Sequence, residues 1–437
     1  MALFFRALCA AVALTLSAPA AARLTSAEQR MVAIVDAEQE RTVAMLEKWV
    51  NQNSGTMNFA GVKAVGDMLR AELDPLGFKV DWIDLGAANR AGHIVARHKG
   101  NGRGKRLLLI GHLDTVFEPD SPFQRWSREG NLGHGPGVGD DKGGMAVIVA
   151  ALRAMKAAGT LKGADITVFL SGDEEDAGPL AIARRDLVAA GKRADAALDF
   201  EGLAQVEGRD MGSIARRSSD EWTLLVTARG GHSSGIFTPS AGSGAIYELA
   251  RIIDTFRREI AEDKLTFNVG LIGGGTSAEL AADNLRVTAN GKTNIIAGAA
   301  MARGDLRAIS PEQIARAQAK MRGIVARPLS GATAEIRFAP DGYPPMAPTE
   351  GSRALLNRLN LVNRDMGLAE MGELDPVRRG AADISFVAKD VDGLVGLGPA
   401  GSGAHSPREK VDIGSIHLQA KRAAILMSRL ARERRSR

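Results

Sequence analysis

Residues that can do chemistry gather in five short clusters between residues 112 and 405 of the chain. They are Gly111-His112-Leu113-Asp114, Gly139-Asp140-Asp141-Lys142, Asp173-Glu174-Glu175-Asp176, Asp199-Phe200-Glu201 and Gly403-Ala404-His405. Four of the clusters follow short apolar runs that predict buried parallel strands. Loops at the ends of such strands converge in space. Histidines and carboxylates that meet there form a nitrogen and oxygen site suited to zinc or a similar divalent ion. The pattern therefore predicts metal-assisted hydrolysis.

His112 and Asp114 stand two residues apart at the end of a predicted strand. In extended backbone both side chains leave on the same face. A metal-binding histidine usually donates its second ring nitrogen to a carboxylate, which fixes its tautomer. The alternative is a capping aspartate beside a surface histidine. The pair alone therefore does not indicate a metal site, and it does so only together with the other clusters.

Asp140 lies in a glycine-rich loop, residues 135–144. The glycines permit a tight backbone that can hold a carboxylate close to a cation. A phosphate cradle at the start of the following helix is the alternative reading. The adjacent carboxylates of Asp140 and Asp141 would repel a phosphate, so the loop favours a cation.

Glu174 and Glu175 are neighbours after a buried strand and point in different directions. One can therefore bind a metal while the other stays free as a general base. A solvated acidic turn is the alternative. His405 would bring a ligand from far along the chain, although a single loop histidine can also be merely exposed.

The elements that must position these residues alternate between helix and strand in the first half of the chain. Helices are predicted at residues 26–51, 59–73 and 143–158, and strands at 79–83, 93–98, 106–110, 165–170 and 194–200. This alternation predicts an α/β fold, with a mostly parallel sheet and helices on both faces.

The pattern changes after residue 212. Strands are predicted at residues 221–228, 266–272, 285–291, 300–306 and 334–338, with helices at 240–260 and 311–326. That order is typical of a small α+β, ferredoxin-like module. A helix at residues 351–366 and a strand at 394–397 then resume the helix and strand pattern of the first half of the chain. We expect a catalytic domain at 23–212 and 339–437, and an inserted lid and dimerisation domain at 213–338.

Composition excludes several classes of protein. A chain of 437 residues with 45% hydrophobic content predicts a globular protein of at least two domains. The net charge of +5 is small, and arginines near the C-terminus supply part of it. Because aromatic residues make up only 4%, the dense basic face with stacking aromatics that nucleic-acid binding needs is not expected.

The N-terminus predicts a signal peptide at residues 1–22. Arg6 provides the positive start, residues 7–16 an apolar stretch, and residues 20–22 a small-residue cleavage site. A membrane anchor is the alternative, but the apolar run is shorter than the roughly 20 residues that span a bilayer. Cys9, the only cysteine, lies in this segment, so the mature chain would hold no disulfide, cysteine nucleophile or thiolate metal site. We expect a periplasmic or secreted protein with no membrane attachment after processing.

Taken together and in this order, the five clusters resemble the M20 family of di-zinc metallopeptidases, and within it the glutamate carboxypeptidase and aminoacylase branch. The resemblance implies two zinc ions per subunit, bridged by Asp140. His112 and Glu201 would complete one metal site, and Glu175 and His405 the other. Cobalt or manganese would suit the same ligands.

The resemblance also implies roles beyond the metal ligands. Glu174 matches the general base that draws a proton from an activated water, and Asp114 the residue that orients His112. His232, in Gly231-His232-Ser233-Ser234, matches a histidine that reaches the active site of a partner subunit. Asn294 and Arg307 match positions that hold the substrate's carboxylate. The resemblance also implies a homodimer.

Three sequence features bear on the subclass. A glutamate at position 201 accompanies carboxypeptidases and deacylases in this family. The loop usually written Gly-Gly-Thr-Asp appears as Gly380-Ala381-Ala382-Asp383, which lacks one hydroxyl near the substrate. The glycine usual after Glu175 is displaced to Gly178.

We therefore expect hydrolysis of the amide bond before a C-terminal amino acid, in small peptides or N-acyl amino acids. A dipeptidase or aminopeptidase of the same family is the alternative enzyme. A protein that captures peptides without cutting them would need metal ligands but no base, so Glu174 argues against it. An interaction protein with a structural metal site is also disfavoured, since such sites are closed by four protein ligands, often cysteines.

Overall fold

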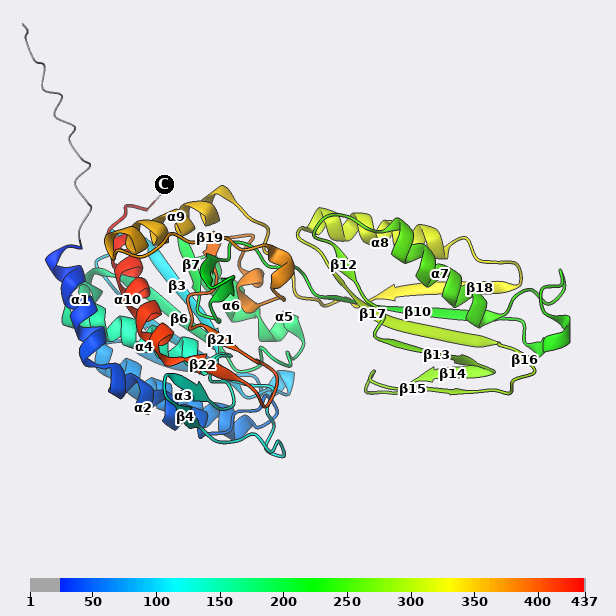
Figure 1. The fold of residues 1–437 in the computed structure, drawn as a ribbon, viewed down its shortest axis with the longest axis horizontal. Helices are drawn as coiled ribbons and strands as arrows, with labels where there is room; N and C mark the ends of the chain where they lie inside the picture. The colour runs from blue at the N-terminus through cyan, green and yellow to red at the C-terminus, as the bar shows by residue number, and fades with distance from the viewer. Residues whose placement is uncertain (1–23, 436–437) are drawn as a thin grey trace, which may run out of the picture.

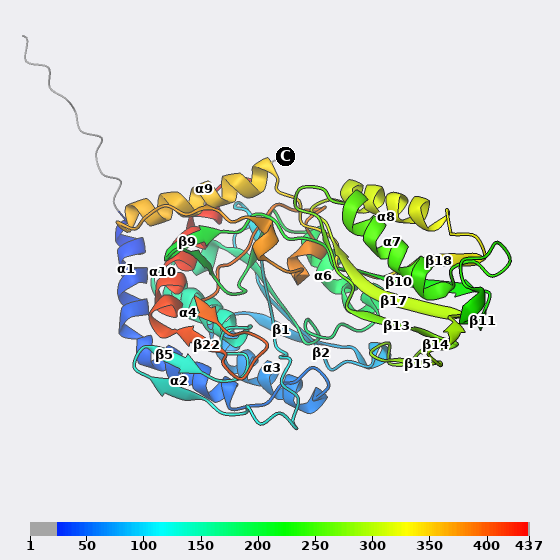
Figure 2. The ribbon, with the colours of Figure 1, turned by 45° about the vertical axis from the view of Figure 1, so that its right-hand side comes forward.

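The computed structural model describes residues 24–435, so the predicted signal peptide lies outside the described residues. No helix in the described part of the chain is both long and apolar enough to cross a membrane. Two bodies lie side by side (Figures 1 and 2). The small body consists of residues 220–338, and the large body of the described residues before and after it.

The large body is built on a six-stranded sheet in the order β1–β2–β6–β3–β7–β20. The strands are β1 (Lys79–Asp84), β2 (Gly92–His98), β6 (Asp165–Ser171), β3 (Arg106–His112), β7 (Ala196–Asp199) and β20 (Gly393–Leu394). The four strands from β6 to β20 run parallel, whereas β1 and β2 pair antiparallel. The predicted mostly parallel sheet is confirmed.

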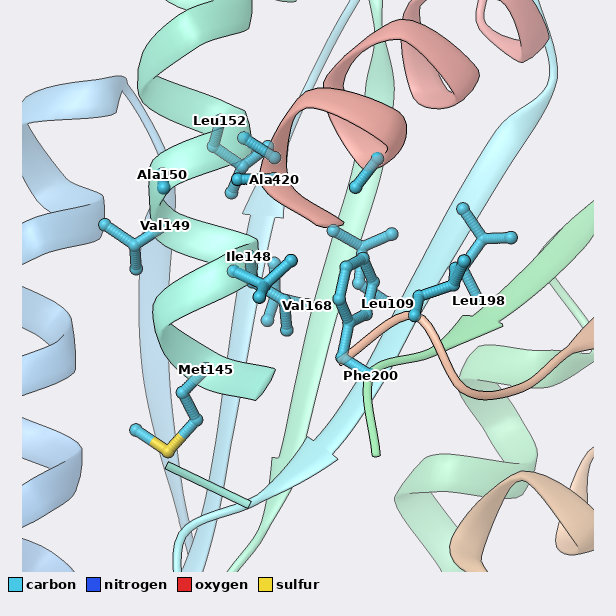
Figure 3. Close-up of a cluster of buried hydrophobic side chains, with 14 of the residues drawn as sticks. Leu109, Met145, Ile148, Val149, Ala150, Leu152, Val168, Leu198, Phe200 and Ala420 are labelled. Atoms are coloured by element: carbon cyan, nitrogen blue, oxygen red, sulfur yellow. The ribbon is translucent and has the colours of Figure 1, made fainter. Parts of the chain in front are cut away.

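Helices cover both faces of this sheet, which explains the continuous apolar runs in its strands. On one face Leu109 packs with α4 (Lys142–Ala157) and α10 (Ile413–Leu430). Figure 3 shows this layer. On the opposite face Leu108 and Ile110 pack with α6 (Arg185–Gly191). Because β3 is buried on both sides, its end is rigidly placed.

One helical prediction in the large body needs correction, and one helix was not predicted. The predicted helix at residues 26–51 is broken into α1 (Ser26–Ala37) and α2 (Gln39–Val50), with non-helical backbone at Glu38. The helix that was not predicted is α10, and it carries part of the C-terminal arginines into the fold. Arg429 pairs with Glu28 at 2.7 Å and with Asp365 at 2.6 Å. Helix α3 (Phe59–Leu73) has the predicted bounds.

The small body is an antiparallel sheet with two helices, as predicted. Its strands are β10 (Asp220–Ala228), β12 (Thr266–Phe267), β13 (Leu271–Gly275), β17 (Ala299–Arg307) and β18 (Ala332–Phe338). They lie in the order β12–β17–β10–β18, with β13 also on β17. Alternate residues of β10, from Trp222 to Val226, form a core with α7 (Ala245–Glu259) and α8 (Pro311–Val325). The chain order and pairing are those of a ferredoxin-like module.

Smaller elements complete the fold. The large body also contains β4 (Ser127–Glu129), β5 (Leu132–His134), β8 (Ala204–Val206), β9 (Arg209–Gly212), β19 (Gly372–Glu373), β21 (Gly401–Ser402), β22 (Lys410–Asp412), α5 (Leu180–Ala183) and α9 (Glu350–Asp365). The small body adds β11 (Gly231–His232) paired with β16 (Ile295–Ile296), and a hairpin of β14 (Ser277–Leu280) and β15 (Val287–Asn290). Of that hairpin, only the second strand is predicted from the sequence.

Two chain segments connect the bodies, and they run next to each other. Arg216 pairs with Met346, and Ser219 with Tyr343, in isolated antiparallel bridges. The outgoing and returning segments therefore form a paired connector at the junction.

Candidate metal centre

The predicted ligands lie at the carboxyl ends of the parallel strands. His112 is the last residue of β3, while Glu175 follows β6 and Glu201 follows β7. Asp140 comes just before helix α4, and His405 lies in the loop between β21 and β22. Since β3, β6 and β7 run parallel and adjacent, their ends meet at one edge of the sheet.

Four of the five predicted ligands form one cluster. Single ligand atoms of His112, Asp140 and Glu175 all lie within 4.8 Å of one another. His112 Nε2 is 3.0 Å from Asp140 Oδ1. His405 Nε2 lies 3.2 Å from Asp140 Oδ2 and 3.0 Å from Glu175 Oε2. Asp140 thus presents one carboxylate oxygen to each histidine, which is the arrangement expected of a bridging ligand.

Glu201 lies beside this cluster with a partner of its own. Its carboxylate pairs with Arg216, and its backbone N–H donates to Asp199 Oδ1 at 2.8 Å. Glu201 and Asp140 line the same cleft, which has a volume of about 160 Å³. The sequence analysis missed Arg216, because nothing in the local pattern connects residue 216 to residue 201.

Asp114 joins the loops that carry the other residues. Its carboxylate is buried and accepts the backbone N–H groups of Glu174 and Glu175, each at 3.1 Å. The Thr56 hydroxyl donates to the same carboxylate at 2.6 Å. His112 Nδ1 lies 3.4 Å from Asp114 Oδ1 and 3.1 Å from the Asp114 carbonyl oxygen. Asp114 therefore fixes His112 and the Glu174–Glu175 backbone at once, and Thr56 is a further residue that the sequence did not reveal.

The predicted base, Glu174, is held through its backbone. The Tyr343 hydroxyl donates to the Glu174 carbonyl oxygen at 2.9 Å. Arg184 donates to Tyr343 at 2.8 Å and forms buried ion pairs of 2.6 Å with Asp173 and with Asp383. Within residues 24–435 no protein donor binds the Glu174 carboxylate. The Glu174 carboxylate is therefore available to act as the predicted general base.

The electrostatics of the cluster suit a cation. Burial raises the pKa of Glu174 well above its ordinary value, and the nearby charges of Glu201, Asp383 and Glu175 add to the effect. Hydrogen bonds to Asp140 and Glu175 raise the pKa of His405 to about 10. Burial opposes ionisation of Asp140, but its hydrogen bonds to His112 and His405 lower its pKa overall.

The donor atoms also fit a metal ion. Glu175 Oε1 is buried, and no protein group in the described part of the chain donates to it. A cation between Glu175 and Asp140 would satisfy that oxygen and reduce the repulsion between the carboxylates. Imidazole and carboxylate ligands without sulfur suit zinc, cobalt or manganese.

The glycine-rich loop is shaped by a residue that the sequence analysis missed. Glu409 accepts the backbone N–H groups of Gly137, Gly139 and Asp140, at distances between 2.8 and 3.1 Å. Gly137 has a φ of +74°, and a Cβ at Gly144 would lie 2.1 Å from the Phe200 carbonyl oxygen. The loop therefore requires glycine at Gly137 for the backbone conformation, and at Gly144 for the close approach to the residue that follows strand β7.

The three predicted substrate-binding residues lie in the small body. His232 ends β11 and Asn294 precedes β16, and both side chains are exposed. This strand pair lies at the end of the small body remote from the large sheet (Figures 1 and 2). Arg307 ends β17 and pairs with Asp305 at 2.7 Å. A Cβ at Gly380 would lie 3.9 Å from Arg307 Nη1, so Arg307 is close to the large body, unlike His232 and Asn294.

Comparisons with known proteins agree with the site. The model of peptidase family M20/M25/M40 matches residues 108–429. The chain is 30% identical over 404 residues to carboxypeptidase G2 from Pseudomonas sp. (strain RS-16), with 89% of each chain covered. It is 30% identical over 202 residues to a succinyl-diaminopimelate desuccinylase from Leptothrix cholodnii, with 44% of this chain and 51% of that protein covered.

A solved structure shares the fold. A dinuclear metal-binding M20 peptidase from Bacillus subtilis superposes with a TM-score of 0.63 at 17% identity, over 90% of this chain and 98% of that one. The family match spans most of the sequence and includes the strands and loops that carry the cluster. The chain therefore belongs to peptidase family M20/M25/M40 and is a metal-dependent peptidase.

Proposed function

We propose that the protein hydrolyses the amide bond before a C-terminal amino acid, as a carboxypeptidase or N-acyl amino acid deacylase. The observation that carries the proposal is the Glu174 carboxylate, which no donor among residues 24–435 binds and which lies within reach of the charges of His112 and Glu175 in the cluster that also holds Asp140 and His405. The likeness to a carboxypeptidase over 89% of the chain supports the direction of cleavage. The shorter likeness to a desuccinylase supports an acyl group as one possible amide partner.

Two zinc ions are the proposed cofactor. Asp140 would bridge them, with His112 and Glu201 on one ion and Glu175 and His405 on the other. When bound, the ions would lower the pKa of a water molecule and polarise the amide carbonyl. Glu201 would have to exchange its contact with Arg216 for this task, wholly or in part.

The protein residues would supply proton transfer and positioning. Glu174 would take a proton from the attacking water and pass it to the leaving amine, which is commonly worth about 10²–10⁴ in rate. Asp114 would keep His112 in the required tautomer. Arg307 would hold the free carboxylate of the substrate through its guanidinium fork.

We further propose that residues 213–338 act as a lid and as a dimerisation domain. His232 and Asn294 are exposed and remote from the cluster of their own chain, so they would serve the site of a second copy. Exposed apolar side chains on the same body support an interface: Phe237 is 66% exposed and packs edge-on against Tyr247, which is 54% exposed.

A mixing experiment tests the shared site. Glu174→Gln and His232→Ala variants should each be nearly inactive alone. Mixed dimers should regain activity, because one of their two sites then holds both native residues. A monomer in solution, or mixtures without regained activity, would contradict the proposal.

Export is proposed from the N-terminal segment at residues 1–22, together with a periplasmic or secreted location. N-terminal sequencing of the mature protein from a bacterial host tests it. We expect the mature chain to begin at Arg23. An intact Met1 on protein recovered from the cytoplasm would overturn it.

The activity itself is tested with zinc-loaded mature protein and matched substrates. A panel of N-acetyl amino acids and N-blocked dipeptides should release a free C-terminal amino acid, seen by mass spectrometry and abolished by a chelator. The same dipeptides with a free N-terminus serve as the comparison. Cleavage of only these unblocked peptides would replace the proposal with a dipeptidase or aminopeptidase.

A further inference from the structure

A basic cleft with a volume of about 410 Å³ lies at the edge of the large sheet that is opposite the metal cluster. It is lined by residues at the starts of β1, β3 and β6, at the end of β2, and at the end of helix α6. Strand β3 begins in this cleft with Arg106 and ends at the metal cluster with His112. At about 3.3 Å per residue the two ends of the strand are about 20 Å apart, so a molecule in the cleft would not reach the metal ligands.

Positive side chains outnumber negative ones in and around the cleft. The lysines and arginines that line it are Lys79, Arg97, Lys99, Arg106, Arg193 and Arg435. Asp165 lines it too and pairs with Arg435. Asp81 pairs with Lys79 and Arg97 from outside the lining. Asp195 pairs in the same way with Arg106 and Arg435. Lys99 and Arg193 are exposed and form no ion pair within residues 24–435. Six positive charges therefore stand against three negative charges.

The strand register brings part of this charge into one row. Lys79 lies opposite Arg97, and Arg97 lies opposite Thr167, so the three side chains share a face of the sheet. Thr167 stands two residues before Phe169, which packs with helix α6, so the row lies on the face that α6 covers. Because α6 ends at Gly191, the row is left open to solvent at this edge. Like charges that oppose each other across strands destabilise a sheet, and a bound anion would relieve the repulsion.

Donors around Thr167 remain available to such an anion. Arg97 donates through Nη1 to Asp81, and its Nε and Nη2 have no acceptor in the described part of the chain. Arg106 donates through Nε and Nη2 to Asp195, which leaves its Nη1. The half-buried Thr167 makes no side-chain hydrogen bond to residues 24–435. Since β6 lies between β2 and β3, an anion above Thr167 would have a guanidinium on each side and a hydroxyl below.

We propose that this cleft binds a small soluble phosphoester that carries two phosphate groups, one of them above Thr167. Each phosphate group carries about −1.5 to −2 charges at pH 7, so two of them match the local excess of positive charge. Guanidinium and ammonium groups bind phosphate oxygens through charge-assisted hydrogen bonds. The volume of the cleft is that of a site for one small molecule, and its concave shape favours a soluble ligand over a flat membrane surface. The site is separate from the proposed hydrolysis.

The test is calorimetric binding of fructose bisphosphate and fructose monophosphate to the zinc-loaded protein, with the metal content checked before and after. The bisphosphate should bind at least about tenfold more tightly, since hydrogen bonds to charged groups are the stronger ones. Replacing both Lys99→Gln and Arg193→Gln should weaken that binding at least about tenfold. Both side chains are exposed and without ion pairs, so the fold should not change. The matched control replaces Arg30→Gln and Lys162→Gln, two exposed cations outside the cleft, and should bind as wild type does.

Thr167→Val separates a built site from general attraction between charges. It removes one hydroxyl, keeps the net charge and retains a residue that suits a strand. It should weaken binding of the bisphosphate about fivefold, the effect of one lost hydrogen bond. Wild-type affinity in this variant would overturn the placement of a phosphate above Thr167.

Three further results would overturn the proposal. Equal weakening in the cleft variant and in the control variant would show attraction to the net charge alone. Tighter binding of propane tricarboxylate than of the bisphosphate would show that the cleft selects carboxylates. Vesicles of phosphatidylglycerol distinguish a lipid headgroup from a soluble ligand. Binding to these vesicles that the Lys99 and Arg193 replacements abolish, without binding of the bisphosphate, would make the cleft a membrane contact instead.

Discussion

The Tyr343 hydroxyl donates a hydrogen bond to the backbone carbonyl oxygen of Glu174 at 2.9 Å. Tyr343 belongs to the connector that returns from the small body, where it pairs with Ser219 of the outgoing segment. Arg184 fixes its hydroxyl from the other side at 2.8 Å. The backbone of the proposed base is thereby linked to the junction between the two bodies.

Tyr343→Phe should therefore lower kcat with little change in KM. One neutral hydrogen bond contributes about 1 kcal/mol, which corresponds to about fivefold in rate if it acts on the position of Glu174. Steady-state kinetics with a cleaved substrate measures the change, and metal content by mass spectrometry should stay unaltered. An unchanged kcat in a variant that lacks the hydroxyl would show that the bond serves only the fold.

Glu174→Gln should retain bound metal and lose at least about a hundredfold in kcat, because the amide cannot accept the proton. Asp176→Asn is the matched control, since Asp176 lies in the same acidic segment and is exposed. Its turnover should remain close to that of wild type. Near-normal turnover of Glu174→Gln, or equal losses in both variants, would contradict the assignment.

The sheet and the place of the candidate ligands at its edge could be predicted, because both follow from local pattern. Leu107 to Ile110 form an apolar run that is buried on both faces, and such a run reads as a parallel strand with its polar residue at the end. The same reasoning identified Glu175 after β6. Asp140 could be predicted as well, because the glycines around it indicate a tight backbone loop.

The partners of those ligands could not be predicted, because each comes from a distant part of the chain. Thr56 meets Asp114 across 58 residues, and Tyr343 meets Glu174 across 169. A single threonine or tyrosine carries no periodic signal. Helix α10 was not predicted either, and Arg429 near its end pairs with the buried Glu28 from the start of the described chain.

Arg307→Lys should raise KM by about tenfold with a smaller effect on kcat. A lysine keeps the charge but cannot form the paired hydrogen bonds by which a guanidinium holds a carboxylate. Arg303→Lys is the matched control on the same face of strand β17, where Arg303 pairs with Glu221 at 2.6 Å. An equal KM in wild type and Arg307→Lys would remove Arg307 from the proposed substrate site.

Glu262 provides a pH test of the small body that is independent of the metal cluster. Its carboxylate pairs with two residues of helix α8, Arg316 at 2.9 Å and Lys320 at 3.0 Å. Hydrogen bonds from Arg316 and Lys320 lower the pKa of Glu262 to about 2. In the unfolded chain the carboxyl returns to its ordinary value, near 4.5.

The stability that Glu262 contributes should thus be present above about pH 4.5 and lost as the pH falls toward 2, because in that interval the unfolded chain binds more protons than the folded one. Glu262→Gln should have a lower Tm than wild type at pH 7, and the difference should shrink between pH 5 and pH 3. The effect is small, at most about 1 kcal/mol for a pair near the surface. Glu259→Gln, at an exposed glutamate without an ion pair among residues 24–435, should show no such dependence. Scanning fluorimetry of both variants and wild type across this range measures the Tm values. A difference between Glu262→Gln and wild type that stays constant with pH would show that these ion pairs do not cause the loss of stability at low pH.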